Sequence, residues 1–403
     1  MASLDKLWAY LEDYRQDPWV VLRLTIRLSA LCILISLLLS PNLWFQEGRD
    51  FLPSPFVPAL AGAPAVINQI LYALTAIVCI WLFFEPRMKR IGIVLLPVFL
   101  YFAAQDQMRA QFYHVMMFFN LIAASLLPAD TAKIEDRHLD PLRYMAIGVY
   151  FWGGAHKISL FFVKELFPGF VAAWIPDKEF AQFIGMFVPF FELSIGLFLL
   201  FPATVRLAQL MAATMLAVVL LSLGPTGYND AMNIWPVNVY LDCLAIFLFS
   251  AKKRPLLRFG TMKKMPVNFA SAALFWFLPV LGLFNITGSH PSLKLYCGCP
   301  GQPIVYLNFG EKEDAARLAR IIPYTLHQER RLYAVSLTRG SLRLTSSVAK
   351  AGAEPFTDGM KGFCDAALYP EDVRLVLREP VSRWTSETKE TRFELCKKPQ
   401  TPN

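Results

Sequence analysis

The sequence predicts an all-α polytopic membrane bundle of about nine transmembrane helices, followed by a small α+β extracytoplasmic C-terminal domain. Three observations predict this fold class. The 403 residues are 55% hydrophobic and only 17% charged, a composition too apolar for an ordinary soluble protein. The apolar residues gather in runs long enough to cross about 30 Å of hydrocarbon, separated by short loops rich in proline, glycine and charge. These runs lack the alternation of barrel strands of about ten residues, so we expect helices.

Each predicted span corresponds to one apolar run. The third and fourth runs are short, so we expect their helices to be tilted or to dip around the polar turn at 105–111. The predicted spans cover 19–40, 65–84, 91–105, 111–128, 143–163, 181–201, 205–223, 231–250 and 266–287. The loop at 164–180 mixes aromatic residues, prolines and a few charges without enough length to span, which favours an interfacial or re-entrant element.

The basic residues of the loops predict the orientation of the bundle. Nearly all loop lysines and arginines lie in alternate loops, and cytoplasmic loops carry such an excess. These loops are 85–90, 129–142, 202–206 and 251–265. We therefore expect a cytoplasmic N-terminus, and an odd number of spans puts the C-terminal domain outside. The short, compact loops favour a bacterial inner membrane. Because these loops account for much of the formal net charge of +8, we expect no nucleic-acid partner.

The chain divides into a membrane domain at 1–287 and a more polar C-terminal domain at 288–403. Alternating or β-branched stretches predict strands in the C-terminal domain, and one amphipathic stretch predicts a helix. The predicted strands are 293–299, 303–309, 372–380 and 390–395, and the predicted helix is 311–322. No catalytic motif is apparent there, so we interpret the domain as one that covers the bundle or docks a partner protein.

The distribution of the seven cysteines agrees with that orientation. Three of them lie in predicted spans, where cysteine acts as small apolar filler: Cys32, Cys79 and Cys243. The other four lie beyond the last span: Cys297, Cys299, Cys364 and Cys396. An even set in an extracytoplasmic domain predicts two disulfides. We expect no metal, because the Cys-Gly-Cys spacing is tighter than usual for zinc and no nearby histidines complete a ligand set.

Ionisable residues inside the predicted spans are the first functional candidates, because a charge near the bilayer centre costs at least about 2.5–3.5 kcal/mol. Lys157 lies in the fifth span, about two turns from its outer end, and Glu192 lies near the middle of the sixth. Gly153 and Gly154 precede the lysine, and such small residues let another helix or a ligand approach closely. Two alternatives remain open. Lys157 and Glu192 form a buried ion pair, or a desolvated Lys157 loses its proton and becomes a usable base.

Further polar residues are predicted near the outer leaflet on neighbouring runs. They are His114 in the fourth span, His156 beside Lys157, and Asn233, Trp235 and Asn238 at the start of the eighth span. Trp235 alternatively anchors the helix at the interface, and the two asparagines alternatively cap or link helices. Asp242 lies one turn further into the eighth span. The convergence of these residues predicts an outward-facing site.

One stretch resembles a known family. Residues 150–158, YFWGGAHKI, resemble the aromatic, small, small, Lys-hydrophobic signature of the horizontally transferred transmembrane (HTTM) superfamily, which includes the vitamin K-dependent γ-glutamyl carboxylase. Residues 192–210 are similar to the next helices of that family. They are equally similar to the DoxX and MauE-like membrane proteins, in which a Gly-x-x-Lys helix precedes a Glu-x-x-x-Gly helix. The resemblance covers roughly residues 110–250.

The resemblance implies roles for three residues. Lys157 falls on the family lysine proposed as the base in vitamin K hydroquinone oxygenation, and His114 falls on a histidine of an earlier helix. His156 and His114 would then be proton or hydrogen-bond partners of Lys157. The C-terminal domain is much shorter than the carboxylase needs to hold a propeptide, so we do not expect carboxylation of a protein substrate.

These expectations combine into one preferred hypothesis. The protein has an outward-facing intramembrane pocket for a quinone or lipid, with carboxylase-like or quinone-linked oxidoreductase activity. Its catalytic residues are Lys157, His156 and His114, and its ligand contacts are Glu192, Trp235, Asn233, Asn238, Gly153 and Gly154. The alternative is a non-catalytic DoxX/MauE-like subunit or scaffold that docks a partner protein through its C-terminal domain. A transporter is disfavoured, because no pair of broken helices repeats between the two halves.

Overall fold

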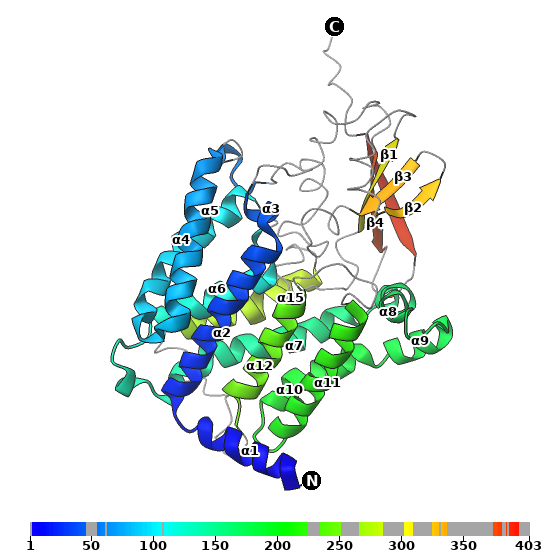
Figure 1. Cartoon of the computed structure of the whole chain (residues 1–403). Coiled ribbons are helices and arrows are strands. Elements are labelled where there is room, and N and C mark those ends of the chain that lie inside the picture. The colour runs from blue at the N-terminus through cyan, green and yellow to red at the C-terminus, as the bar shows by residue number, and fades with distance from the viewer. Residues whose placement is uncertain are drawn as a thin grey trace.

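The computed structural model describes residues 2–45, 55–60, 63–106, 109–223, 234–250, 266–284, 302–308, 325–329, 332–336, 374–380, 384 and 387–394. Helices dominate these residues, and a small sheet lies at the end of the bundle opposite α1 (Figure 1). The helices up to residue 139 are α1 (Ala2–Tyr14), α2 (Pro18–Leu39), α3 (Pro41–Trp44), η1 (Pro58–Leu60), α4 (Ala65–Phe84), η2 (Pro86–Val94), α5 (Leu95–Gln105), α6 (Phe112–Ser125), η4 (Thr131–Lys133) and η5 (Asp136–Leu139). Those that follow are α7 (Asp140–Lys157), η6 (Phe162–Leu166), α8 (Phe167–Val171), α9 (Lys178–Gly185), α10 (Val188–Leu199), α11 (Val205–Leu223), α12 (Ile234–Leu248), α14 (Pro266–Ala272), η7 (Ala273–Phe277) and α15 (Leu278–Leu283).

The apolar helices are those of a multi-pass membrane protein. Six helical segments of the described residues are long and apolar enough to span a membrane: Pro18–Leu39, Ala65–Phe84, Pro86–Gln105, Lys178–Leu199, Val205–Ser222 and Pro266–Leu283. A seventh is reached if the bent pair Asp136–Lys157 and Phe162–Val171 counts as one broken span. Phe112–Ser125 and Trp235–Leu248 are apolar but shorter. The helical membrane fold is therefore confirmed, while the nine spans and their orientation stay predictions.

The first long helix begins where its sequence predicts. The Asp17 side chain accepts a hydrogen bond of 2.8 Å from the N–H of Trp19, which satisfies one of the free backbone donors at the start of α2. Pro18 occupies the first turn, where its missing N–H has no cost. The preceding helix, α1, is tied to the far end of α12, since Glu12 accepts hydrogen bonds from Arg15 and from the Ser250 hydroxyl.

The helix that carries Lys157 ends at that residue. After α7 the chain bends by 88° before η6 and α8 continue. Ser159 provides the physical reason, because its hydroxyl accepts a hydrogen bond of 3.1 Å from the N–H of Phe162 and so caps the following helix. The continuous helix predicted at 143–163 is thus broken, and Lys157 lies at the helix end rather than two turns from it.

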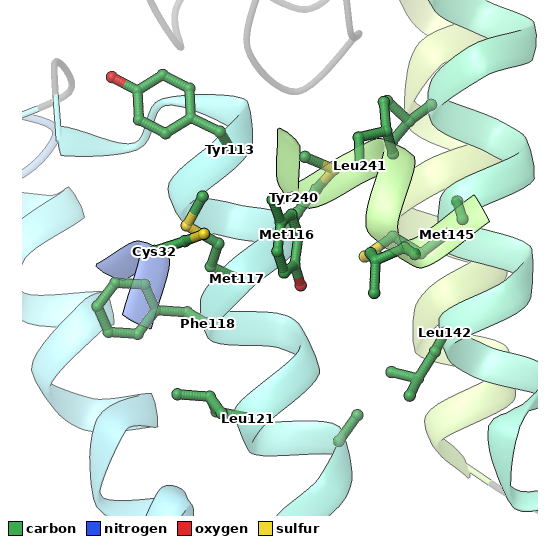
Figure 2. Packing of buried hydrophobic residues seen from close by; sticks show 14 of the residues in the cluster. Cys32, Tyr113, Met116, Met117, Phe118, Leu121, Leu142, Met145, Tyr240 and Leu241 are labelled. Carbon is green, nitrogen blue, oxygen red and sulfur yellow. The ribbon is translucent and has the colours of Figure 1, made fainter. Parts of the chain in front are cut away.

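The larger of the two apolar clusters among the described residues forms the core of the bundle, and in it α6 packs against helices that include α2 and α7. Figure 2 shows Met116 and Met117 of α6 beside Tyr240 of α12, with Met145 of α7 and Cys32 of α2 on either side. Tyr240 also forms buried hydrogen bonds with the hydroxyl of Ser29 and the side chain of Asn120. Those bonds tie α2, α6 and α12 together, and a buried phenol needs such partners.

The described C-terminal residues form a five-stranded antiparallel sheet in the order β2-β3-β1-β4-β5. Its strands are β1 (Gln302–Asn308), β2 (Thr325–Glu329), β3 (Leu332–Ser336), β4 (Arg374–Pro380) and β5 (Thr388–Glu394). β1, β4 and β5 lie where strands were predicted, whereas β2 and β3 were not predicted. Phe393 of β5 packs against the core of the bundle. The strand predicted at 293–299 and the helix predicted at 311–322 lie outside the described residues, so the α+β character of this domain stays a prediction.

Candidate functional site

A cavity of about 300 Å³ lies between α6, α7, α10, α11 and α12, and η6, α8 and α9 complete its wall. Most of its lining is apolar and much of it is aromatic. The aromatic lining residues are Phe112, Tyr113, Tyr150, Phe162, Phe167, Phe170 and Phe191. Three charged side chains among the described residues also line it, namely Lys157, Glu192 and Asp242. An apolar cavity with a few convergent polar groups is the usual form of a ligand site.

Lys157 and Glu192 form an ion pair at the wall of this cavity. The ammonium of Lys157 donates to Oε2 of Glu192, and the two side chains are only 10% and 9% exposed. The sequence left an ion pair and a base as alternatives, and in this structure the pair is formed. Because both side chains are about nine-tenths buried, each charge depends on the other for compensation.

The two glycines that precede Lys157 have different neighbours. Gly154 lies against the backbone of α10, where an added Cβ would be 2.9 Å from Cα of Leu193 and closer still to O of Pro189. Gly153 lines the cavity, and a Cβ there would be 2.5 Å from Oε1 of Glu192. The sequence predicted that another helix or a ligand approaches these glycines. In the structure, helix α10 approaches Gly154, and the carboxylate of Glu192 approaches Gly153.

Asp242 adds a second carboxyl group to the cavity. Oδ1 of Asp242 accepts a hydrogen bond of 2.5 Å from the hydroxyl of Tyr150, which is 2% exposed. Glu192 and Asp242 both line the cavity, so two carboxyl groups share it with one cation, Lys157, among the described lining residues. Asp242 was predicted one turn inside the eighth span but not as a site residue. Tyr150 was not predicted at all, because a tyrosine in an aromatic run gives no polar signal.

The cavity reaches the lateral surface of the bundle beside α11. Thr214 and Val218 lie one turn apart on this helix, and both are exposed while they line the cavity; Val218 is 47% exposed. This face of α11 is apolar, with Leu210 58% exposed and Leu221 51% exposed. Exposed apolar faces of membrane-spanning helices contact lipid, and the exposed lining residues Thr214 and Val218 belong to such a face.

The segment after the break closes another side of the cavity. Phe167 and Phe170 of α8 and Ile184 of α9 line it, while Phe180 and Phe183 on the outer side of α9 are each 54% exposed. The interfacial or re-entrant element predicted at 164–180 corresponds to this hairpin of short helices. Its depth in the membrane stays a prediction.

His114, predicted as catalytic, does not line the cavity. It is fully buried, its Nδ1 donates to the carbonyl oxygen of Arg109 at 2.9 Å, and its Nε2 is 2.7 Å from the Ser36 hydroxyl. Arg109 is equally buried, and its guanidinium donates to the carbonyl oxygens of Leu43 and Trp44. His114 thus belongs to a hydrogen-bonded network that holds the α2–α3 corner against α6.

We predict that His114→Phe destabilises the protein without changing ligand affinity. The Ser36 hydroxyl and the Arg109 carbonyl each lose a buried partner, so the free energy of unfolding should fall by about 1–3 kcal/mol. Reversible unfolding in mixed detergent micelles measures this change, and ligand binding is measured on the folded fraction. If the variant is as stable as wild type but no longer binds ligand, His114 takes part in ligand binding and this prediction is wrong.

The remaining predicted residues differ in their positions. Asn238 lines the cavity, whereas His156 and Trp235 do not. His156 is buried and packs on Trp152, with ring centroids 5.6 Å apart, and Trp235 is 38% exposed at the start of α12. Asn233 lies outside the described residues.

The cysteine predictions are tested only in the bundle. Cys32, Cys79 and Cys243 are free thiols, the first two buried, as expected for apolar filler. The cysteines predicted to form disulfides, Cys297, Cys299, Cys364 and Cys396, lie outside the described residues. Within the described part of the chain, no group of three or more His, Cys, Asp or Glu side chains is placed to hold a metal ion.

Comparisons with protein-family models, with curated proteins and with solved structures give no match for this chain.

Proposed function

We propose that this protein binds a lipid-soluble molecule, a quinone or a lipid, in the cavity beside α11. The observation that carries the proposal is the composition of the cavity: an aromatic and aliphatic wall, an opening between Thr214 and Val218, and the Lys157–Glu192 pair. The apolar wall stabilises a hydrocarbon chain or ring by about 25 cal/mol per Å² of apolar surface buried. The ion pair provides a polar contact that orients the head group.

A catalytic role for Lys157 extends this proposal through the HTTM resemblance. A lysine acts as a base only after it loses a proton, and Oε2 of Glu192 is the acceptor that the structure places beside it. Transfer of one proton from the ammonium to this carboxylate leaves a neutral amine and a neutral carboxylic acid. In this scheme Lys157 contacts the ligand, whereas His114 and His156, which do not line the cavity, take no part in the proton transfer.

A second candidate function is a non-catalytic scaffold, and the α7–α10 crossing favours it. Gly154 packs on the backbone of α10, and Gly196 of α10 packs on the backbone of α7, with a Cβ there 2.8 Å from N of Phe151. The Lys157–Glu192 pair joins the same two helices. The pair then serves packing alone, and the C-terminal domain docks a partner protein.

We also infer that the protein lies in a bacterial inner membrane with α1 on the cytoplasmic side and the sheet outside. The basic loops support this orientation. The positions of α1 and the sheet at opposite ends of the bundle agree with it (Figure 1).

A bulky residue at the opening is expected to block the site. Val218→Trp places an indole where the cavity reaches the lateral surface, so the amount of co-purified quinone or lipid should fall at least about tenfold. Mass spectrometry of small molecules extracted from the purified protein measures that amount.

Leu207→Trp is the matched control for this variant. Leu207 lies on the same helix and is 48% exposed, close to the 47% of Val218, but it does not line the cavity. Equal ligand content in wild type, control and Val218→Trp would contradict the proposed site. A co-purifying polypeptide in place of a small molecule would favour the scaffold.

A further inference from the structure

The charges around the cavity do not balance. Lys157 and Glu192 compensate each other, and Asp242 adds a second carboxylate without a second cation in the described lining. In an apolar cavity such a carboxylate needs either a proton or a ligand group that donates to it.

Asp242 is positioned to make a contact with a ligand. Asp242 is 5% exposed and lines the cavity, and its Oδ1 accepts a hydrogen bond from the hydroxyl of Tyr150. Within the described residues, Oδ2 of Asp242 accepts no hydrogen bond. The hydrogen bond from Tyr150 leaves this second oxygen available to a ligand inside the cavity.

We propose that Asp242 recognises the head group of the ligand, and that this head group carries a hydrogen-bond donor and no negative charge. The class of ligand is an apolar molecule that carries a hydroxyl or a protonated amine. Of the proposed ligands, a hydroquinone or a lipid with such a group fits, whereas an oxidised quinone does not, because its carbonyl groups only accept hydrogen bonds. This inference rests on the proposed ligand-binding function and specifies the chemistry of the same site.

Electrostatics favours a head group that donates a hydrogen bond and disfavours one that carries a negative charge. An anionic head group would add a third negative charge near Glu192 and Asp242, where the single cation, among the charged residues of the described lining, is already paired. Like charges in a site with little water repel strongly, because the effective dielectric constant there is far below that of water. A hydroxyl or ammonium group instead gives Asp242 a hydrogen bond, and a charge-assisted one is roughly twice as strong as a neutral one.

The test compares three probes that share one chain and differ in head group. Full-length protein in lipid nanodiscs is titrated with dodecylamine, dodecanol and dodecanoate, and affinities are derived from the rise in unfolding temperature that binding to the folded state causes. We expect the amine and the alcohol to bind at least tenfold more tightly than dodecanoate, a difference of about 1.4 kcal/mol. The two donor probes distinguish a neutral from a cationic head group.

Asp242→Asn tests the residue itself while preserving its shape. The affinity for dodecylamine should fall about tenfold and that for dodecanoate should rise, because the carboxylate charge is gone. Tyr150→Phe removes the hydroxyl that orients the carboxyl and should weaken both donor probes less. Asp13→Asn, an exposed position on α1, is the control and should leave all three affinities unchanged.

The outcomes separate this inference from the proposed function. Tightest binding of dodecanoate by the wild-type protein, or an unchanged order of the three probes in Asp242→Asn, would overturn the role of Asp242 while ligand binding stands. Failure of all three probes to bind, together with equal ligand content of Val218→Trp and wild type, would overturn the proposed function and this inference with it.

Discussion

Replacing Lys157 by methionine is expected to lower the free energy of unfolding by about 3–5 kcal/mol. Methionine retains most of the length of the side chain but removes the ammonium. The side chain of Glu192 is only 9% exposed and would then be a buried carboxylate without its cation. Removal of one partner of a buried ion pair is costly for this reason, more so than removal of both. Reversible unfolding of the purified protein in mixed detergent micelles measures the change.

The double variant Lys157→Met with Glu192→Met separates the two candidate functions. Most of the stability should return, because apolar side chains of similar size often replace a buried ion pair without loss. A double-mutant cycle then gives the coupling energy of the pair, and Lys157→Arg is the control that retains the charge. If the restored double variant has lost its ligand, the pair contacts that ligand. If it retains its ligand, the pair serves packing, and Lys157 is not the base.

Gly154→Ala is expected to destabilise the protein by about 1–3 kcal/mol through a clash at the α7–α10 crossing. The new Cβ would lie 2.9 Å from Cα of Leu193 and even closer to N of Leu193 and O of Pro189. These are backbone atoms, which cannot rotate away as the end of a side chain can. The two helices would have to separate. This movement would also displace Glu192, which directly precedes Leu193 in α10.

Gly169→Ala is the control for this substitution. Gly169 lies in α8, and apart from its chain neighbours and the backbone of its own helix no atom lies within 4 Å of the position that its Cβ would occupy. Alanine is favoured over glycine in a helix by about 0.5–1 kcal/mol, so this variant should be as stable as wild type or slightly more stable. A similar effect of the two substitutions would contradict the close crossing of α7 and α10.

Several residues that line the cavity were recognisable in the sequence because they break an apolar run. Lys157, Glu192 and Asp242 each place a charge among hydrocarbon side chains, and such residues are rare enough to stand out. Tyr150 and the aromatic wall of the cavity gave no such signal, since aromatic residues are ordinary components of membrane helices. The break after Lys157 was also missed, because the capping side chain of Ser159 is a short polar group like many others.

The position of His114 could not be predicted from the sequence, because it depends on which face of α6 points toward the cavity. Tyr113 and His114 are consecutive residues of α6, and an α-helix of 3.6 residues per turn separates them by about 100° around its axis. Tyr113 lines the cavity, while His114 contacts Ser36 on α2. The sequence placed both residues near one end of the same helix, but it contained no information on which face of that helix meets which neighbour.

The sequence by itself determined that this chain is a helical multi-pass membrane protein and which apolar runs contain charged residues. Hydrophobicity and length suffice for this, because the bilayer acts on each segment separately. Only the tertiary structure decided that Lys157 pairs with Glu192, that Asp242 shares their cavity, and that His114 lies outside it. These facts depend on the rotation of each helix and on its neighbours, which are set by the packing of many side chains at once.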